Sequence, residues 1–124
     1  MARYFTHEEA KQMLPIIRPL IEKIMAIRND ILARQPEMSV LLEKIGKNGG
    51  NQELSKIDQE FQTLERLVSQ IQEIGIVVKD INLGLVDFPS IREGREVYLC
   101  WRYGEDTIQY WHEIDAGFAG RQLI

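Results

Sequence analysis

The sequence predicts an α+β protein in which a long antiparallel helical hairpin is followed by a small antiparallel sheet. Apolar residues recur every three or four positions as far as residue 75 and every second position after it. A glycine-rich loop at 46–51 must reverse the helical part. Since 124 residues suit one domain, we expect a single domain, with the hairpin at 1–75 and the sheet and a glycine-rich tail at 76–124.

The first helix is expected to begin at a capping box. Thr6 and Glu9 have the spacing at which each side chain bonds the backbone N–H of the other residue. Pro15 and Pro19 follow within the helix, and because proline removes a backbone donor we expect a kink there, or a short helix and a restart. The apolar residues after the cap have heptad spacing. They are Ala10, Met13, Ile17, Leu20, Ile24, Ile27 and Ile31, flanked by Leu14, Ile21, Met25 and Leu32.

A second apolar stripe predicts the returning helix. Gly75 is placed to end it in the left-handed conformation, with Ile76 as the accompanying apolar contact. An apolar patch at 40–45 after Ser39 allows a short helix near the turn. The stripe contains Leu54, Ile57, Phe61, Leu64, Val68 and Ile71.

The rest of the chain predicts three or four strands. Runs rich in β-branched and aromatic residues lie at 76–81, 85–88, 96–102 and 107–112, and Pro89 is expected to stop the second run. Turns are expected at 82–84 and 92–95. A two-residue loop at 104–105 would pair Val97 with His112 and Leu99 with Tyr110 on one face of the sheet.

The tail from His112 to Arg121 has the highest concentration of side chains that can take part in catalysis or ligand binding. An imidazole can act as a base, a carboxylate can orient it, and a guanidinium can hold an anion. We expect no metal site, because neighbouring residues on a strand point to opposite faces; the weak metal candidates are His112, Asp115 and Asp87. The catalytic candidates are His112, Asp115 and Glu113, and the ligand-binding candidates are Asp87, Arg95, Trp101, Trp111 and Arg121.

Each of these residues also has a purely structural interpretation. His112 can be a hydrogen-bonded histidine of the core or of an interface, and Cys100 can be a packing residue. The tryptophans can be sheet core. The arginines can form a network with the surrounding acids that holds the tail to the sheet.

Three C-terminal motifs are specific enough to indicate a family. They are GLVDFP at 84–89, GREVYLCW at 94–101 and WHEIDAGFAGR at 111–121. Together with the helical opening around 5–20, they make the chain resemble the bacterial domain-of-unknown-function family numbered 2203. The resemblance covers nearly the whole chain, but it implies no activity, because that family is uncharacterised.

Composition argues against several classes of protein. A net charge of −4 disfavours nucleic-acid and membrane binding, one cysteine excludes an internal disulfide, and no apolar run is long enough to span a membrane. With no secretory signal, we expect a soluble cytoplasmic protein without a cofactor.

Two classes of function remain open, and the sequence does not decide whether the protein is an enzyme. The first is a non-enzymatic interaction or dimerisation module that forms a homodimer through the hairpin or binds a protein partner. The alternative is a small-molecule-binding protein or hydrolase, with a polar pocket around His112, Asp115 and Arg121 that takes a small anionic ligand.

Overall fold

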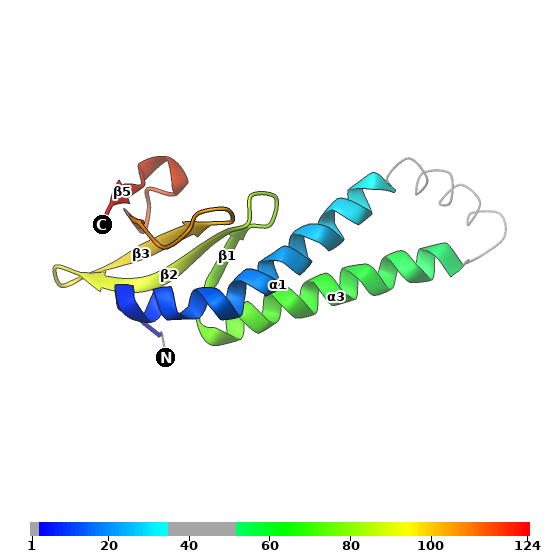
Figure 1. Cartoon of the computed structure of the whole chain (residues 1–124), viewed down its shortest axis with the longest axis horizontal. Coiled ribbons are helices and arrows are strands. Elements are labelled where there is room, and N and C mark those ends of the chain that lie inside the picture. The colour runs from blue at the N-terminus through cyan, green and yellow to red at the C-terminus, as the bar shows by residue number, and fades with distance from the viewer. Residues whose placement is uncertain (1–2, 35–51) are drawn as a thin grey trace.

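The computed structural model describes residues 3–34 and 52–124. Figure 1 shows the long helices running antiparallel to each other, against the sheet at one end and past it at the other. The α+β class and the helical hairpin are therefore confirmed. The predicted short helix at 40–45 and the loop at 46–51 lie outside the described residues. The elements are α1 (His7–Ala33), α3 (Gln52–Ile74), β1 (Val77–Asp80), β2 (Leu85–Arg92), β3 (Arg95–Arg102), β4 (Tyr110–Glu113), the 3-10 helix η1 (Phe118–Gly120) and β5 (Gln122–Leu123).

The start of α1 is the predicted capping box. The Glu9 backbone N–H donates to the Thr6 hydroxyl at 3.1 Å, and the Thr6 N–H donates to the Glu9 carboxylate at 2.8 Å. The helix then continues through Pro15 and Pro19 without a restart. Figure 1 shows α1 changing direction after its first turns, in the region where the two prolines remove backbone donors.

The buried stripe of α1 differs from the predicted one by a small rotation. Leu14 and Ile21 are fully buried, whereas Met13 and Leu20 are only partly buried. The reason is that α1 contacts the sheet as well as α3, so that its buried face is centred between the two. In α3 the expected stripe residue Phe61 is 46% exposed.

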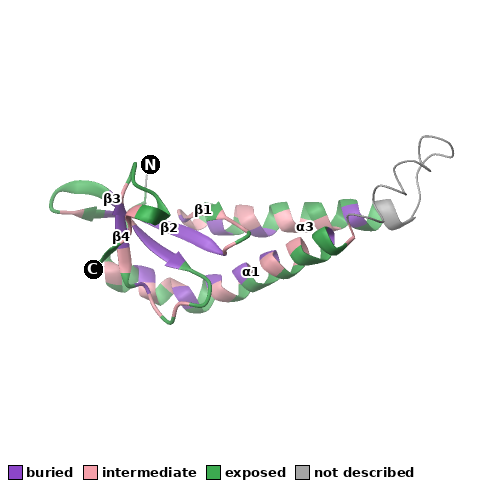
Figure 2. Cartoon of the chain, turned by 90° about the horizontal axis from the view of Figure 1, so that it is seen from above, coloured by how far each residue is buried: buried purple, intermediate pink, exposed green. Residues whose placement is uncertain are grey.

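The part of the chain that the structure describes contains five strands, which form one antiparallel sheet in the order β1-β2-β3-β4-β5. It has one strand more than the expected maximum, because residues of the tail pair with β4 as β5. The face toward the helices carries apolar side chains, and Figure 2 shows most of β2 as buried. These core residues are Val86, Phe88, Val97, Leu99, Trp101 and Trp111.

Pro89 does not stop β2, contrary to the prediction. β1 pairs with β2 only between Leu85 and Asp87, so at Pro89 the strand is an edge on that side. Because no strand lies on that side, the N–H that proline lacks costs the sheet no hydrogen bond. The Pro89 carbonyl accepts a hydrogen bond from the Phe5 N–H at 2.7 Å.

The predicted register between β3 and β4 was wrong by one residue. Tyr98 pairs with His112 and Leu99 with Trp111. The connection at 103–109 is longer than a two-residue loop, and it turns Ile108 into the core. Because a shift of one residue moves every side chain to the other face, Trp111 packs toward the helices and His112 lies on the opposite face.

Candidate functional site

A carboxylate, a thiol and an imidazole meet on the face of the sheet that points away from the helices. Asp87, Cys100 and His112 come from the neighbouring strands β2, β3 and β4. The register pairs Asp87 directly with Cys100, and it pairs His112 with Tyr98, which lies two residues before Cys100 in β3. Their ligand atoms lie within 4.8 Å of one another, and all three residues are at most 1% exposed.

The imidazole of His112 has a defined orientation. Its Nδ1 lies 2.7 Å from the Glu113 carbonyl oxygen and its Nε2 lies 3.0 Å from Oδ1 of Asp87. Because a carbonyl oxygen only accepts, Nδ1 carries a proton and donates it. Nε2 then faces a carboxylate oxygen, and this contact is favourable only if a proton or a cation lies between the two atoms.

The surroundings of Asp87 and Cys100 hold the thiol in its neutral form. Burial raises the pKa of the Cys100 thiol to about 12, and the negative charge of Asp87 adds to the shift. The thiol is therefore protonated at neutral pH, which argues against a nucleophilic cysteine. Lys79 lies at the edge of the cluster, with its Nζ 4.0 Å from Oδ2 of Asp87 and 42% of its side chain exposed.

The other polar candidates of the tail have separate partners. Arg121 donates from Nη2 to both carboxylate oxygens of Glu105 at 2.7 Å, and its guanidinium lies 3.9 Å from the centre of the Tyr110 ring. Arg95 donates to Glu113, and this bond holds the pKa of the Glu113 carboxyl below its usual range. Asp115 is exposed. The structure thus brings His112 to Asp87 and directs Arg121 to Glu105.

Residues 3–124 match the family described as "Uncharacterized conserved protein (DUF2203)". The chain belongs to this family. That confirms the resemblance noted from the C-terminal motifs, while the bacterial origin stays a prediction. No match to the chain was found among curated proteins or among solved structures. In residues 3–34 and 52–124, neither long helix has a stretch apolar enough to cross a membrane.

Two tryptophans of this family member, expected as ligand-binding candidates, lie in the core. Trp101 is fully buried and its indole N–H donates to the Glu105 carbonyl at 3.0 Å. Trp111 is 6% exposed, with the Arg92 guanidinium 4.6 Å from its ring centre. Both therefore support the sheet, and Trp101 also anchors the loop that carries Glu105.

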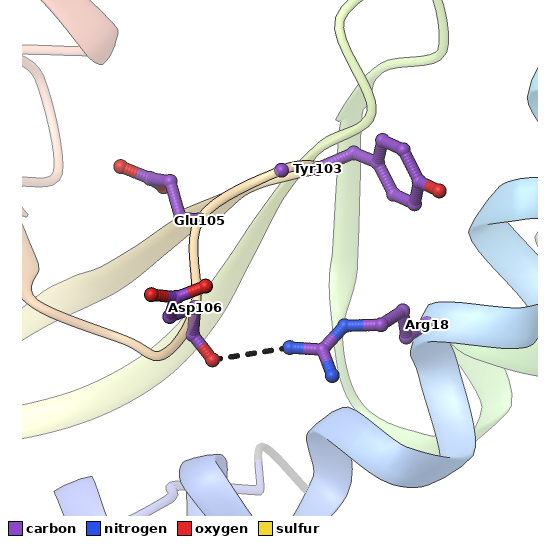
Figure 3. Close-up of a pocket in the computed structure, with 5 residues that line it drawn as sticks. Arg18, Tyr103, Glu105 and Asp106 are labelled. Atoms are coloured by element: carbon purple, nitrogen blue, oxygen red, sulfur yellow. Dashed lines mark hydrogen bonds between the residues drawn. The ribbon is translucent and has the colours of Figure 1, made fainter.

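A shallow pocket of about 210 Å³ lies between α1 and the connection from β3 to β4. Figure 3 shows Arg18 reaching from α1 toward this connection, where it donates to the Asp106 carbonyl at 3.1 Å. The Tyr103 hydroxyl donates to Glu22 at 3.1 Å. Sequence reasoning missed this pocket, because Arg18 lies in an amphipathic helix and gives no local signal. Its lining residues are Arg18, Tyr103, Gly104, Glu105 and Asp106.

Proposed function

We propose that the protein is an interaction module that works as a homodimer through the part of the hairpin beyond the sheet. The observation that carries this proposal is that both helices continue an apolar face past the sheet. Met25 packs against the core, and Leu32, seven residues later, is 40% exposed. Val68 also packs against the core, and Phe61, seven residues earlier, is 46% exposed. Seven residues are about two helical turns, so each pair shares one face.

The inner side of this part of the hairpin has its own small contact. Ile31 and Ile57 are buried outside the main core cluster, and an ion pair joins Arg34, the residue that caps the C-terminus of α1, to Glu60 of α3. A two-helix layer buries one stripe of each helix and leaves any second stripe in water. Phe61 and Leu32 belong to such a second stripe among the described residues.

A second copy of the chain is the occupant that these features favour. An isologous contact places the same patch of both copies around a two-fold axis, so one exposed apolar stripe is complementary to itself. Two hairpins joined in this way give the four-helix arrangement, in which both stripes are buried. The sheet then stays available at the other end of each copy for a protein partner.

The test is the mass of the full-length protein in solution, measured by light scattering after size exclusion. We expect a dimer at micromolar concentration, and a monomer for the double variant Leu32→Ser with Phe61→Ser. The matched control is Ile16→Ser, which removes an apolar side chain that is 53% exposed on the earlier part of α1 and should leave the dimer intact. A monomeric wild-type protein at tens of micromolar, or a double variant that stays dimeric, overturns the proposal.

The alternative function, a small-molecule-binding protein or hydrolase around His112, Asp115 and Arg121, has weaker support. Arg121 is engaged by Glu105 and Asp115 is exposed, so neither is directed at the His112 ring by a contact in the described chain. A cytoplasmic location is part of the proposal for the interaction module. It is supported by the cysteine count of one, since proteins of a reducing compartment do not depend on disulfides.

A further inference from the structure

We propose that Asp87, Cys100 and His112 bind a zinc ion on the outer face of the sheet. They offer one carboxylate oxygen, one sulfur and one imidazole nitrogen, which are the three kinds of donor that zinc takes in proteins. This proposal departs from the expectation from sequence, which was that there is no metal site and which named His112, Asp115 and Asp87 only as weak candidates. It is also independent of the hairpin that carries the proposed dimer.

The distances within the cluster suit a tetrahedral ion. Zinc bonds of about 2.0–2.3 Å hold the ligand atoms about 3.3–3.6 Å apart. Nε2 of His112 and Oδ1 of Asp87 are separated by 3.0 Å, and all three ligand atoms lie within 4.8 Å of one another. Side-chain adjustments of about 1 Å are therefore enough to close the site, without movement of the strands.

The orientation of His112 is the second, independent observation. Its Nδ1 proton is donated to the Glu113 carbonyl at 2.7 Å, which is the outer contact that metal-bound histidines usually make. This contact fixes the ring so that Nε2, the nitrogen left to bind a metal, points at Asp87. A cation between the ring and the carboxylate turns two facing acceptors into two ligands.

Charge and burial favour a dication at this position. The Asp87 carboxylate, in a residue that is only 1% exposed, needs a positive partner inside the protein, and a dication supplies one with enough charge left to balance the thiolate that forms when Cys100 binds it. The thiol gives up its proton when it binds the ion, as metal-bound cysteines do. The Lys79 ammonium, which now lies near Asp87, has a side chain exposed enough to turn outward.

The donor set selects zinc over the hard cations. Magnesium and calcium prefer sites made of oxygen, whereas sulfur and imidazole together favour zinc and its neighbours in the first transition row. Three protein ligands leave the fourth tetrahedral position to a water molecule or another small ligand. In the absence of the ion, the same groups form a buried hydrogen-bonded cluster with Lys79 at its edge.

Cobalt(II) substitution tests the site directly. The full-length protein is stripped with a chelator, kept reduced with a phosphine and titrated with Co²⁺, and absorption is recorded with metal stoichiometry. Because the chain has one cysteine, a thiolate-to-cobalt charge-transfer band can come only from Cys100. We expect this band to saturate at one Co²⁺ per chain and to disappear when one equivalent of Zn²⁺ is added. In a separate thermal melt, zinc at a hundredfold excess over its Kd should raise the melting temperature by about 10 °C.

Variants identify the remaining ligands. We expect His112→Gln and Asp87→Asn to lose the stoichiometric metal. The matched control is His7→Gln, because His7 is the other histidine of the chain and its Nε2 contacts the Ile108 carbonyl instead. A wild-type protein that gives no thiolate band overturns the proposal without any variant. A band of full strength in His112→Gln overturns it as well, and far-ultraviolet circular dichroism shows that each variant is folded.

Discussion

Along α1 every fully buried side chain is an alanine, leucine or isoleucine, whereas the outer face of the sheet buries a carboxylate, a thiol and an imidazole side by side. Apolar side chains gain from any water-free contact, so a small rotation of α1 still gives a buried stripe. Buried polar groups need particular partners at particular distances. The hairpin therefore depends on the apolar area that it buries, whereas the outer face of the sheet depends on the strand register.

The largest expected effect comes from breaking the polar cluster. Asp87→Ala removes the carboxylate 3.0 Å from His112 and leaves a buried ring nitrogen and Lys79 without their partner. We expect a loss of about 3–5 kcal/mol in the free energy of unfolding. The measurement is urea denaturation at pH 7 in the presence of a chelator, so that no metal contributes.

The control for this change is Asp115→Ala, which removes an exposed carboxylate of the same sheet region. Its expected effect is within about 0.5 kcal/mol. Similar losses for the two variants would contradict the view that the outer face depends on its buried polar partners.

An intermediate effect is expected at Gly84, where the sheet meets the hairpin. Its φ is +65°, and a Cβ there would lie 2.6 Å from the Tyr103 Cβ and 2.9 Å from the Met25 sulfur. Gly84→Ala should therefore cost about 2 kcal/mol, from backbone strain and from displacement of α1. Thermal unfolding of Gly104→Ala is the comparison, because Gly104 has a φ of +102° but open space around it, and only the smaller strain of about 1 kcal/mol should appear.

The smallest effect is expected at the helix cap. Thr6→Ala removes the acceptor for the Glu9 N–H and should cost about 1 kcal/mol, measured by thermal denaturation. Thr63→Ala is the matched control, because its hydroxyl bonds a carbonyl within α3 and caps nothing. If the two threonine variants melt together, the capping box adds nothing to the hairpin.

The same cap predicts a dependence on pH. Hydrogen bonds from Thr6 lower the pKa of Glu9, so its contribution is present above the pKa of the unfolded chain and is lost as the pH falls through the lowered value. The difference in stability between wild type and Glu9→Gln should accordingly shrink in acid.

Most residues of the candidate site could be predicted from the sequence, but the residues that they contact could not. Asp87 and His112 are both candidates in the sequence, yet a two-residue loop at 104–105 predicts His112 on the core face opposite Val97, where the structure has Glu113. Cys100 was expected only to pack, because nothing within its strand shows that a carboxylate lies directly across from it. The missing information was the length of the connection from β3 to β4. That length depends on Ile108 packing into the core, which is a tertiary contact.

The sequence by itself determined the features whose causes lie within a few residues. The capping box at Thr6, the end of α3 at Gly75 and the turn at 92–95, where Glu93 and Gly94 have positive φ, are of this kind. The tertiary structure decided the register of β4, the course of β2 through Pro89 and the pairing of the tail with β4. These depend on which strand lies alongside, and a period of two residues leaves that choice open because both faces of this sheet bury large side chains.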